Sequence, residues 1–152
     1  MPLRPLPLPP HVPGSLWLGS MPGRFESWSA FQADAGRAGL SQVVCLTPRS
    51  ELAEHSPAYH AAVVTGDLPF RWRQVPMRNF GLPEDGPGFR REVQESAQAL
   101  REGGAGLLHC AAGLGRTGTA AACVLKALGV PAHTALQRVR DAGSNPQNAQ
   151  QS

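Results

Sequence analysis

Apolar residues follow two different spacings along this chain, and the two spacings alternate. Short segments rich in β-branched and large apolar residues predict strands, and longer segments in which apolar residues recur every three or four positions predict helices. In the first of these helices, Phe25, Trp28, Phe31 and Ala35 share one face, and we expect this stripe in the core. Strands are expected at 15–19, 42–46 and 70–75, with a fourth that ends at 107–108, and helices at 25–38, 57–64, 89–101, 119–128 and 131–142, with a helical turn at 51–54.

The order of these elements indicates the fold class. Strands that alternate with helices favour a single-domain α/β fold with a mainly parallel central sheet flanked by helices. A chain of 152 residues is long enough for one such domain with a sizeable core. We place this domain at 15–152 and interpret residues 1–14 as a proline-rich N-terminal arm of polyproline type. A flexible tail is the simplest role for the arm, and a ligand for a proline-binding module is the alternative.

The turn between the last predicted strand and the helix after it concentrates the chemistry. A thiol, Cys110, follows the strand, and a glycine-rich stretch leads from it toward the helix. A helix N-terminus offers N–H groups without intrahelical partners and the positive end of the helix dipole. Such a place binds phosphate and favours a thiolate over a thiol. Gly113 and Gly115 permit positive φ and a close approach of the backbone to a ligand.

Each polar residue of this stretch fits one step of phosphoryl transfer. The thiolate of Cys110 is suited to attack phosphorus, and the planar fork of Arg116 matches two phosphate oxygens. The Thr117 hydroxyl is suited to hydrogen-bond the sulfur and help it leave, and His109 to orient the loop. We expect the loop amides to bind phosphate, sulfate or vanadate; they belong to Ala111, Ala112, Gly113, Leu114, Gly115 and Arg116.

Two other interpretations use the same residues. The run Gly113–Gly118 spells G-x-G-x-x-G, the dinucleotide fingerprint, which requires a second strand that ends in an acid about 20 residues further on. No strand is predicted after this run, and the first acid, Asp141, lies within a helical pattern. The second interpretation treats Cys110 as a buried small apolar residue, which leaves the histidine, the glycines, the arginine and the threonine without a role.

Composition narrows the classes of function. The chain has no run of about 18 apolar residues that would predict a membrane span, and prolines interrupt the apolar part of its N-terminus, unlike a signal peptide. Three cysteines without such a signal favour reduced thiols in a cytoplasm. The net charge of +3, with Lys126 as the only lysine, suits an anionic substrate and does not indicate nucleic-acid binding. We expect no metal and no cofactor.

The run 109–118 reads His-Cys-x5-Arg-Thr-Gly and resembles the signature of the cysteine-dependent protein tyrosine phosphatase superfamily. The segments Val43–Glu51, Ser56–Tyr59 and Asn79–Asp85 extend the resemblance to compact dual-specificity-like phosphatases of bacteria and to the cyclin-dependent-kinase-inhibitor-associated phosphatase group. The resemblance implies the protein tyrosine phosphatase-like fold and a two-step hydrolysis. In it the cysteine forms a phosphocysteine, the arginine and the loop amides bind the phosphate, and the threonine assists hydrolysis.

The resemblance fails at one position. The family loop reads Pro-x-x-Asp-x-x-x-Pro, and its aspartate is the general acid that protonates the leaving oxygen. The matching segment, Pro76–Pro83, has Asn79 in place of that acid. An amide does not supply the proton that a carboxylic acid would. Asp85 and Glu84 are the candidates to replace it, and solvated loop acids are the alternative interpretation of both.

Three further expectations concern residues outside the loop. The water-orienting glutamine of the family matches Gln150 loosely. The resemblance also makes Cys45 a candidate redox partner of Cys110, and a buried structural thiol is the alternative. Arg71 and Arg73 share one face of their strand, which is either a solvated face or a rim that gathers phosphorylated substrate.

The sequence therefore predicts a metal-independent phosphatase that hydrolyses phosphate monoesters in proteins, phosphotyrosine first and phosphoserine or phosphothreonine next. Two alternatives are a phosphoanhydride hydrolase such as an RNA 5′-triphosphatase, whose good leaving group needs no acid, and a phosphoprotein-binding module of low activity. The loop has Ala111, Ala112 and Leu114 where polyphosphoinositide phosphatases resemble one another in carrying lysines. We therefore do not expect a highly charged inositol substrate.

Overall fold

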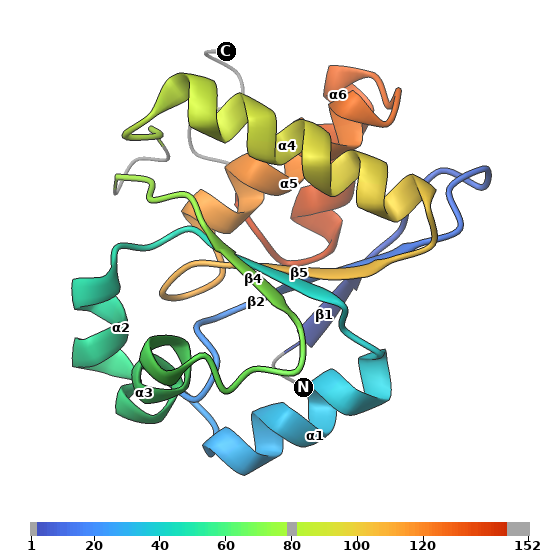
Figure 1. The fold of residues 1–152 in the computed structure, drawn as a ribbon. Coiled ribbons are helices and arrows are strands. Elements are labelled where there is room, and N and C mark those ends of the chain that lie inside the picture. The colour runs from blue at the N-terminus through green and yellow to red at the C-terminus, as the bar shows by residue number, and fades with distance from the viewer. Residues whose placement is uncertain (1–2, 79–81, 146–152) are drawn as a thin grey trace.

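The computed structural model describes residues 3–78 and 82–145. Within these residues a sheet of five strands lies between two layers of helices (Figure 1). The strands are β1 (Leu3–Leu6), β2 (Ser15–Gly19), β3 (Gln42–Cys45), β4 (Arg71–Gln74) and β5 (Ala105–His109). The helices are α1 (Trp28–Ala38), α2 (Arg49–His55), α3 (Pro57–Thr65), α4 (Gly86–Arg101), α5 (Gly115–Ala127) and α6 (Ala132–Asp141).

The sheet has the strand order β1-β2-β5-β3-β4. Strand β5 pairs in parallel with β2 and β3, β4 pairs in parallel with β3, and β1 is antiparallel to β2. The α/β fold with a mainly parallel sheet is thus confirmed. Strand β5 is the central strand. Open α/β folds bind ligands at the carboxyl ends of their strands, and the loop with Cys110 follows that end of β5.

Helices α4, α5 and α6 cover one face of the sheet, and α1, α2 and α3 lie on the other (Figure 1). Adjacent residues of β5 serve the two layers, because Leu108 belongs to the core beneath α4–α6 and Leu107 to the core beneath α1. A strand buried on both faces reads as a continuous apolar run, which is the pattern seen before Cys110. No helix in the described part of the chain is long and apolar enough to cross a membrane.

The N-terminal segment differs from the flexible tail we expected. Strand β1 pairs with β2 along its length, from Leu3 opposite Gly19 to Leu6 opposite Leu16. Leu3 and Leu6 are buried, one in the core of each sheet face. The prolines are compatible with this pairing because an edge strand needs donors on one side only. The segment is extended, as the prolines predict, but two leucines anchor it to the sheet.

The start of α1 corrects one expected core residue. The Ser27 side chain accepts the Ala30 N–H at 3.1 Å and caps the helix, which therefore begins after Phe25. Phe25 is 66% exposed, and the guanidinium carbon of Arg24 lies 4.6 Å from its ring centroid. Phe31 is buried, as the aromatic stripe predicts. The helix begins about one turn later than the spacing of apolar residues predicts.

Candidate active site

The loop after β5, residues 110–114, connects the strand to α5. Helix α5 begins at Gly115, earlier than the predicted Thr119, so Arg116 and Thr117 belong to its first turn. Gly113 has φ of +76°, and a Cβ atom there would lie 2.6 Å from the backbone of Gly19 in β2. Positive φ and this close approach both require glycine. The loop is thus folded against the end of β2, with the helix N-terminus directed back at the strand end.

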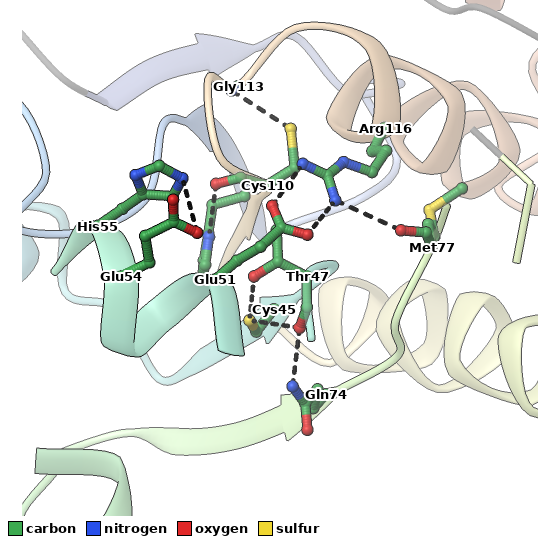
Figure 2. Close-up of polar contacts among 11 residues, drawn as sticks. Cys45, Thr47, Glu51, Glu54, His55, Gln74, Met77, Cys110, Gly113 and Arg116 are labelled. Carbon is green, nitrogen blue, oxygen red and sulfur yellow. Dashed lines mark hydrogen bonds and ion pairs between the residues drawn. The ribbon is translucent and has the colours of Figure 1, made fainter. Parts of the chain in front are cut away.

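Cys110 lies at the base of this loop with its sulfur buried. The Gly113 N–H donates to Cys110 Sγ at 3.3 Å (Figure 2). Burial alone would raise the pKa of the Cys110 thiol, but the Thr117 hydroxyl, the Thr117 and Gly113 N–H groups and the Arg116 charge outweigh it. The pKa of Cys110 therefore lies below its ordinary value, which favours the nucleophilic thiolate.

Thr117 is completely buried next to this sulfur. Its hydroxyl oxygen has no partner in ordinary hydrogen-bond geometry among the described residues, yet it is near enough to Cys110 to lower the thiol pKa. A buried polar group without a close partner needs an explanation. The Cys110 sulfur beside this hydroxyl supplies one, because Thr117 lowers the pKa of that thiol.

Arg116 is held by a carboxylate that the sequence did not single out. Its two terminal nitrogens donate to the two oxygens of Glu51 in α2, each at 3.0 Å, and Nη1 also reaches the Met77 carbonyl oxygen at 3.4 Å (Figure 2). Such a bidentate pair fixes both the position and the plane of the guanidinium. The side chain of Arg116 is only 9% exposed, against 25% for Glu51, so the charge is presented inside the site rather than in solvent.

His109 is fully buried and oriented by two further residues. Its Nδ1 lies 3.1 Å from the Cys110 carbonyl oxygen, and its Nε2 lies 2.7 Å from the Tyr59 hydroxyl. The Trp72 Nε1–H donates to that hydroxyl at 2.7 Å, so the hydroxyl hydrogen is available for His109 Nε2. Burial lowers the pKa of His109 to about 4, which keeps the ring neutral with its proton on Nδ1, toward the Cys110 carbonyl.

The carbonyl groups of the loop are held from its outer side. Met21 N–H donates to the Ala111 oxygen at 3.2 Å, and Asn145 N–H donates to the Leu114 oxygen at 3.2 Å. Leu114 and Ala112 have exposed side chains at the mouth of the site. These two carbonyl oxygens of the loop are thus occupied by donors from other segments, while the Gly113 N–H is directed at the Cys110 sulfur.

The candidate acids have different positions. Asp85 is exposed and caps α4, where its side chain accepts the Gly88 N–H at 3.1 Å. This bond also explains why α4 begins before the predicted residue 89. Glu84 is exposed, and its N–H donates to the Pro76 carbonyl. Asn79 and Gln150 lie outside the described residues.

The structure shows the surroundings of Cys45, the candidate redox partner of Cys110. Cys45 is fully buried among Met21, Leu52 and Tyr59, whereas Cys110 packs in the core on the other face of the sheet. Burial raises the pKa of Cys45 to about 11, so this thiol is unreactive compared with Cys110.

Arg73 is neither a solvated side chain nor a free rim cation. It forms ion pairs with Glu92 at 2.8 Å and Glu95 at 3.0 Å, and it donates to Gln42 at 2.7 Å. These contacts tie β4 to α4. Among the described residues, no three histidine, cysteine or acidic side chains lie together in a way that would hold a metal ion.

Comparison with known proteins identifies the family. A family model described as the DSP-PTPase phosphatase domain of Swiss Army Knife proteins, PTP-SAK, matches residues 11–151. The chain belongs to this family. The resemblance to dual-specificity-like cysteine phosphatases is thereby confirmed, while a bacterial origin stays a prediction. A search of curated proteins gives no match.

Solved structures share the fold. The kinase associated phosphatase, with serine in place of its catalytic-site cysteine, superposes with a TM-score of 0.81 at 20% identity, over 97% of this chain and 88% of that one. Human DUSP28 gives a TM-score of 0.65 at 22% identity, over 98% and 87% of the two chains. The human tyrosine phosphatase-like serine/threonine/tyrosine-interacting protein gives 0.68 at 18% identity, over 97% and 89%. At these identities the likeness concerns the fold.

Proposed function

We propose that this PTP-SAK domain is an active phosphatase that hydrolyses phosphate monoesters through a phosphocysteine on Cys110. One observation carries the proposal. The sulfur of Cys110 accepts the Gly113 N–H at 3.3 Å at the N-terminus of α5, and its pKa is lowered although the side chain is buried. A thiolate surrounded by amide donors and beside a fixed guanidinium is suited to meet a phosphoryl group.

In the first step the Cys110 thiolate attacks phosphorus in line with the ester oxygen. An S–P bond forms, the P–O bond breaks, and the electron pair leaves with the ester oxygen, which takes up a proton from solvent. Arg116 and the loop amides stabilise the charge on the equatorial oxygens. Glu51 contributes indirectly, because it fixes the plane of the guanidinium before substrate arrives.

In the second step water attacks the phosphocysteine. A P–O bond forms, the S–P bond breaks, inorganic phosphate leaves, and the sulfur regains its negative charge. The Thr117 hydroxyl is buried beside that sulfur and is suited to stabilise the charge as it returns. The same contacts that lower the pKa of Cys110 in the free protein therefore make it a better leaving group.

Phosphotyrosine in a protein or peptide is the substrate we propose, with phosphoserine and phosphothreonine as poorer ones. Ala112 and Leu114 place exposed apolar side chains around the anion site, and Leu114 is 49% exposed. An apolar rim around a single phosphate site suits an aromatic monoester better than a highly charged headgroup. Free phosphate, sulfate and vanadate are expected to compete for the loop.

The decisive experiment traps the intermediate. The protein is mixed with a phosphotyrosyl peptide, quenched in acid within the first turnover and mapped by mass spectrometry, and we expect phosphate on Cys110. Cys110→Ser is expected to lose the adduct and turnover while it still binds phosphate. Cys123→Ser is the matched control, since Cys123 lies on α5 as a half-buried thiol whose pKa burial raises. Full turnover by Cys110→Ser would overturn the proposal.

Asn79 favours a second candidate function. Without a general acid, the enzyme is best matched to a good leaving group, such as the phosphoanhydride of an RNA 5′-triphosphate, or to phosphoprotein binding with little turnover. Release of phosphate from triphosphate RNA at a rate above that from phosphotyrosine would favour the hydrolase of phosphoanhydrides. Tight binding of phosphopeptide with no adduct in the trapping experiment would favour the binding module.

A further inference from the structure

The Gly113 carbonyl of the phosphate-binding loop is held by two side chains from opposite ends of the chain. Arg4 in β1 donates to it through Nη2, and Ser144, which follows α6, donates through its hydroxyl at 2.7 Å. Ser144 is buried and Arg4 is partly buried. A backbone oxygen with two side-chain donors is firmly oriented, and one of those donors carries a positive charge.

Arg4 is itself placed by α6. Its Nη1 donates to the Ala142 carbonyl oxygen at 2.8 Å, at the C-terminus of that helix, where a cation is favoured by the helix dipole. Gly143 adjoins the same guanidinium, and a Cβ atom there would lie 2.8 Å from Nη1. The planar fork of Arg4 therefore bridges two carbonyls, one at a helix end and one in the loop, which a single ammonium group cannot do in the same way.

The orientation of the Gly113 carbonyl bears directly on the anion site. In a trans peptide the C=O of one residue and the N–H of the next point in opposite directions. A Gly113 carbonyl turned outward toward Arg4 therefore turns the Leu114 N–H to the opposite side. The Gly113 N–H already donates to Cys110 Sγ. Because glycine is the most permissive residue at this position, the plane of its peptide depends on such outside contacts.

We propose that Arg4 is a positioning residue of the phosphate-binding loop, which holds the Gly113 carbonyl away from the anion and adds a positive charge behind the loop. The inference rests on the proposed function of this loop as the phosphate site. The charges of Arg4 and the Cys110 thiolate also interact: burial lowers the pKa of Arg4, and the thiolate opposes that shift. If Arg4 only connected β1 to α6, its loss would leave the pKa of Cys110 and the affinity for anions unchanged.

The test compares Arg4→Met with Arg4→Lys and Arg101→Met. Arg101 is the matched control, because it donates to the Ala127 carbonyl at 2.7 Å on an exposed surface, away from the loop. Two readouts are measured on each protein: the pH profile of iodoacetate alkylation at Cys110, resolved by peptide mapping, and the dissociation constant of inorganic phosphate. Neither requires turnover, so a failure of the proposed enzymatic activity does not count as a failure of this inference.

We expect Arg4→Met to move the alkylation profile to higher pH and to weaken phosphate binding about tenfold, close to the lower limit for one hydrogen bond from a charged group. Arg4→Lys keeps the charge without the fork, so we expect a smaller change in the same direction. Arg101→Met is expected to match the unmodified protein. If Arg4→Met does not fold, Arg4→Lys provides the comparison. Alkylation and phosphate affinity equal to those of Arg101→Met would overturn the inference.

Discussion

The loop after β5 and the segment after β4 both border the site, and they are built in different ways. The first is tied at almost every peptide: Met21 and Asn145 hold two of its carbonyls, Arg4 holds a third, and His109 adjoins a fourth. The second contains the position of the expected general acid. A bridge between residues 77 and 83 and hydrogen bonds from the Arg78 N–H to the Leu82 carbonyl and from the Glu84 N–H to the Pro76 carbonyl join its described residues. The loop after β5 is thus held by residues from β1, from Met21 and from the segment after α6, whereas the bridge and hydrogen bonds of the segment after β4 join its own two ends.

This difference separates two functions of the proposed site: activation of the nucleophile and protonation of the leaving group. Binding and activation of the nucleophile depend on fixed dipoles and one guanidinium, which the fold supplies through many contacts. In the proposed mechanism, protonation of the leaving group needs a carboxyl group, and the position where the resemblance expects one is Asn79. On this proposal the first function is kept while the second is weakened. The following changes are designed to break one half of the site and leave the other intact.

Arg116→Lys should have the largest effect on the binding half. Lysine cannot form the planar pair with Glu51 or grip two phosphate oxygens, so about two charge-assisted hydrogen bonds are lost. At about 1.5–3 kcal/mol each, their loss lowers kcat/KM on a phosphotyrosyl peptide by about 10²- to 10⁴-fold. Steady-state kinetics measure it, with Arg101→Lys as the control. A change below tenfold would mean that the fork of Arg116 is not what binds the phosphate.

Asn79→Asp should restore a general acid for the leaving group. A positioned general acid contributes about 10²- to 10⁴-fold, so we expect turnover of phosphotyrosine to rise by about 10²-fold or more and its dependence on leaving-group basicity to flatten. Rates for a series of aryl phosphates measure both effects. Asp85→Asn is the paired variant, because Asp85 is the other candidate for the general acid. Its side chain also caps α4. Loss of turnover in Asp85→Asn, with no gain in Asn79→Asp, would move the general acid to Asp85.

The buried imidazole of His109 should make the fold sensitive to acid. Its pKa is about 4 in the folded protein and about 6.5 when unfolded, so below pH 6.5 the unfolded chain binds more protons. Stability should therefore fall as pH drops from 6.5 to 4, by about 3 kcal/mol in total. Urea unfolding at several pH values measures this.

His109→Gln should remove most of that slope, at the cost of lower stability at neutral pH. His133→Gln, on the exposed surface of α6, is the control and should keep the slope. A His109→Gln protein with the same pH dependence as the parent would assign the acid sensitivity to other groups.

Glu51→Gln should have the smallest of these effects. The neutral amide still accepts one hydrogen bond from Arg116 but no longer pairs with its charge, so the guanidinium is held less firmly. Because Glu51 is a quarter exposed, we expect phosphate binding to weaken only about tenfold, near 1.4 kcal/mol. Isothermal titration with phosphate measures it. Glu54→Gln, on the exposed side of the same helix, should bind as the parent does, and equal losses in both would remove the role given to Glu51.

The sequence by itself determined the loop after β5 and its local chemistry, because everything that defines it lies within one short segment. A strand end, a thiol, two glycines, an arginine and a helix start follow one another in 106–118, and their chemistry is local. The alternation of strands and helices likewise determined the α/β class. The sequence did not predict the exact starts of α1, α4 and α5. Caps such as Ser27 and Asp85 are single side chains, and whether they cap a helix depends on the backbone around them.

Only the tertiary structure decided which residues support the loop. Glu51 lies 65 positions from Arg116, Tyr59 lies 50 positions from His109, and Arg4 lies 109 positions from Gly113. Spacing along the chain carries no information about such pairs, because they meet only when the strand order β1-β2-β5-β3-β4 brings their elements to the same end of the sheet. The proline-rich start of the chain illustrates the limit most clearly. Its composition resembles a free tail, and two buried leucines with one arginine make it part of the site's frame.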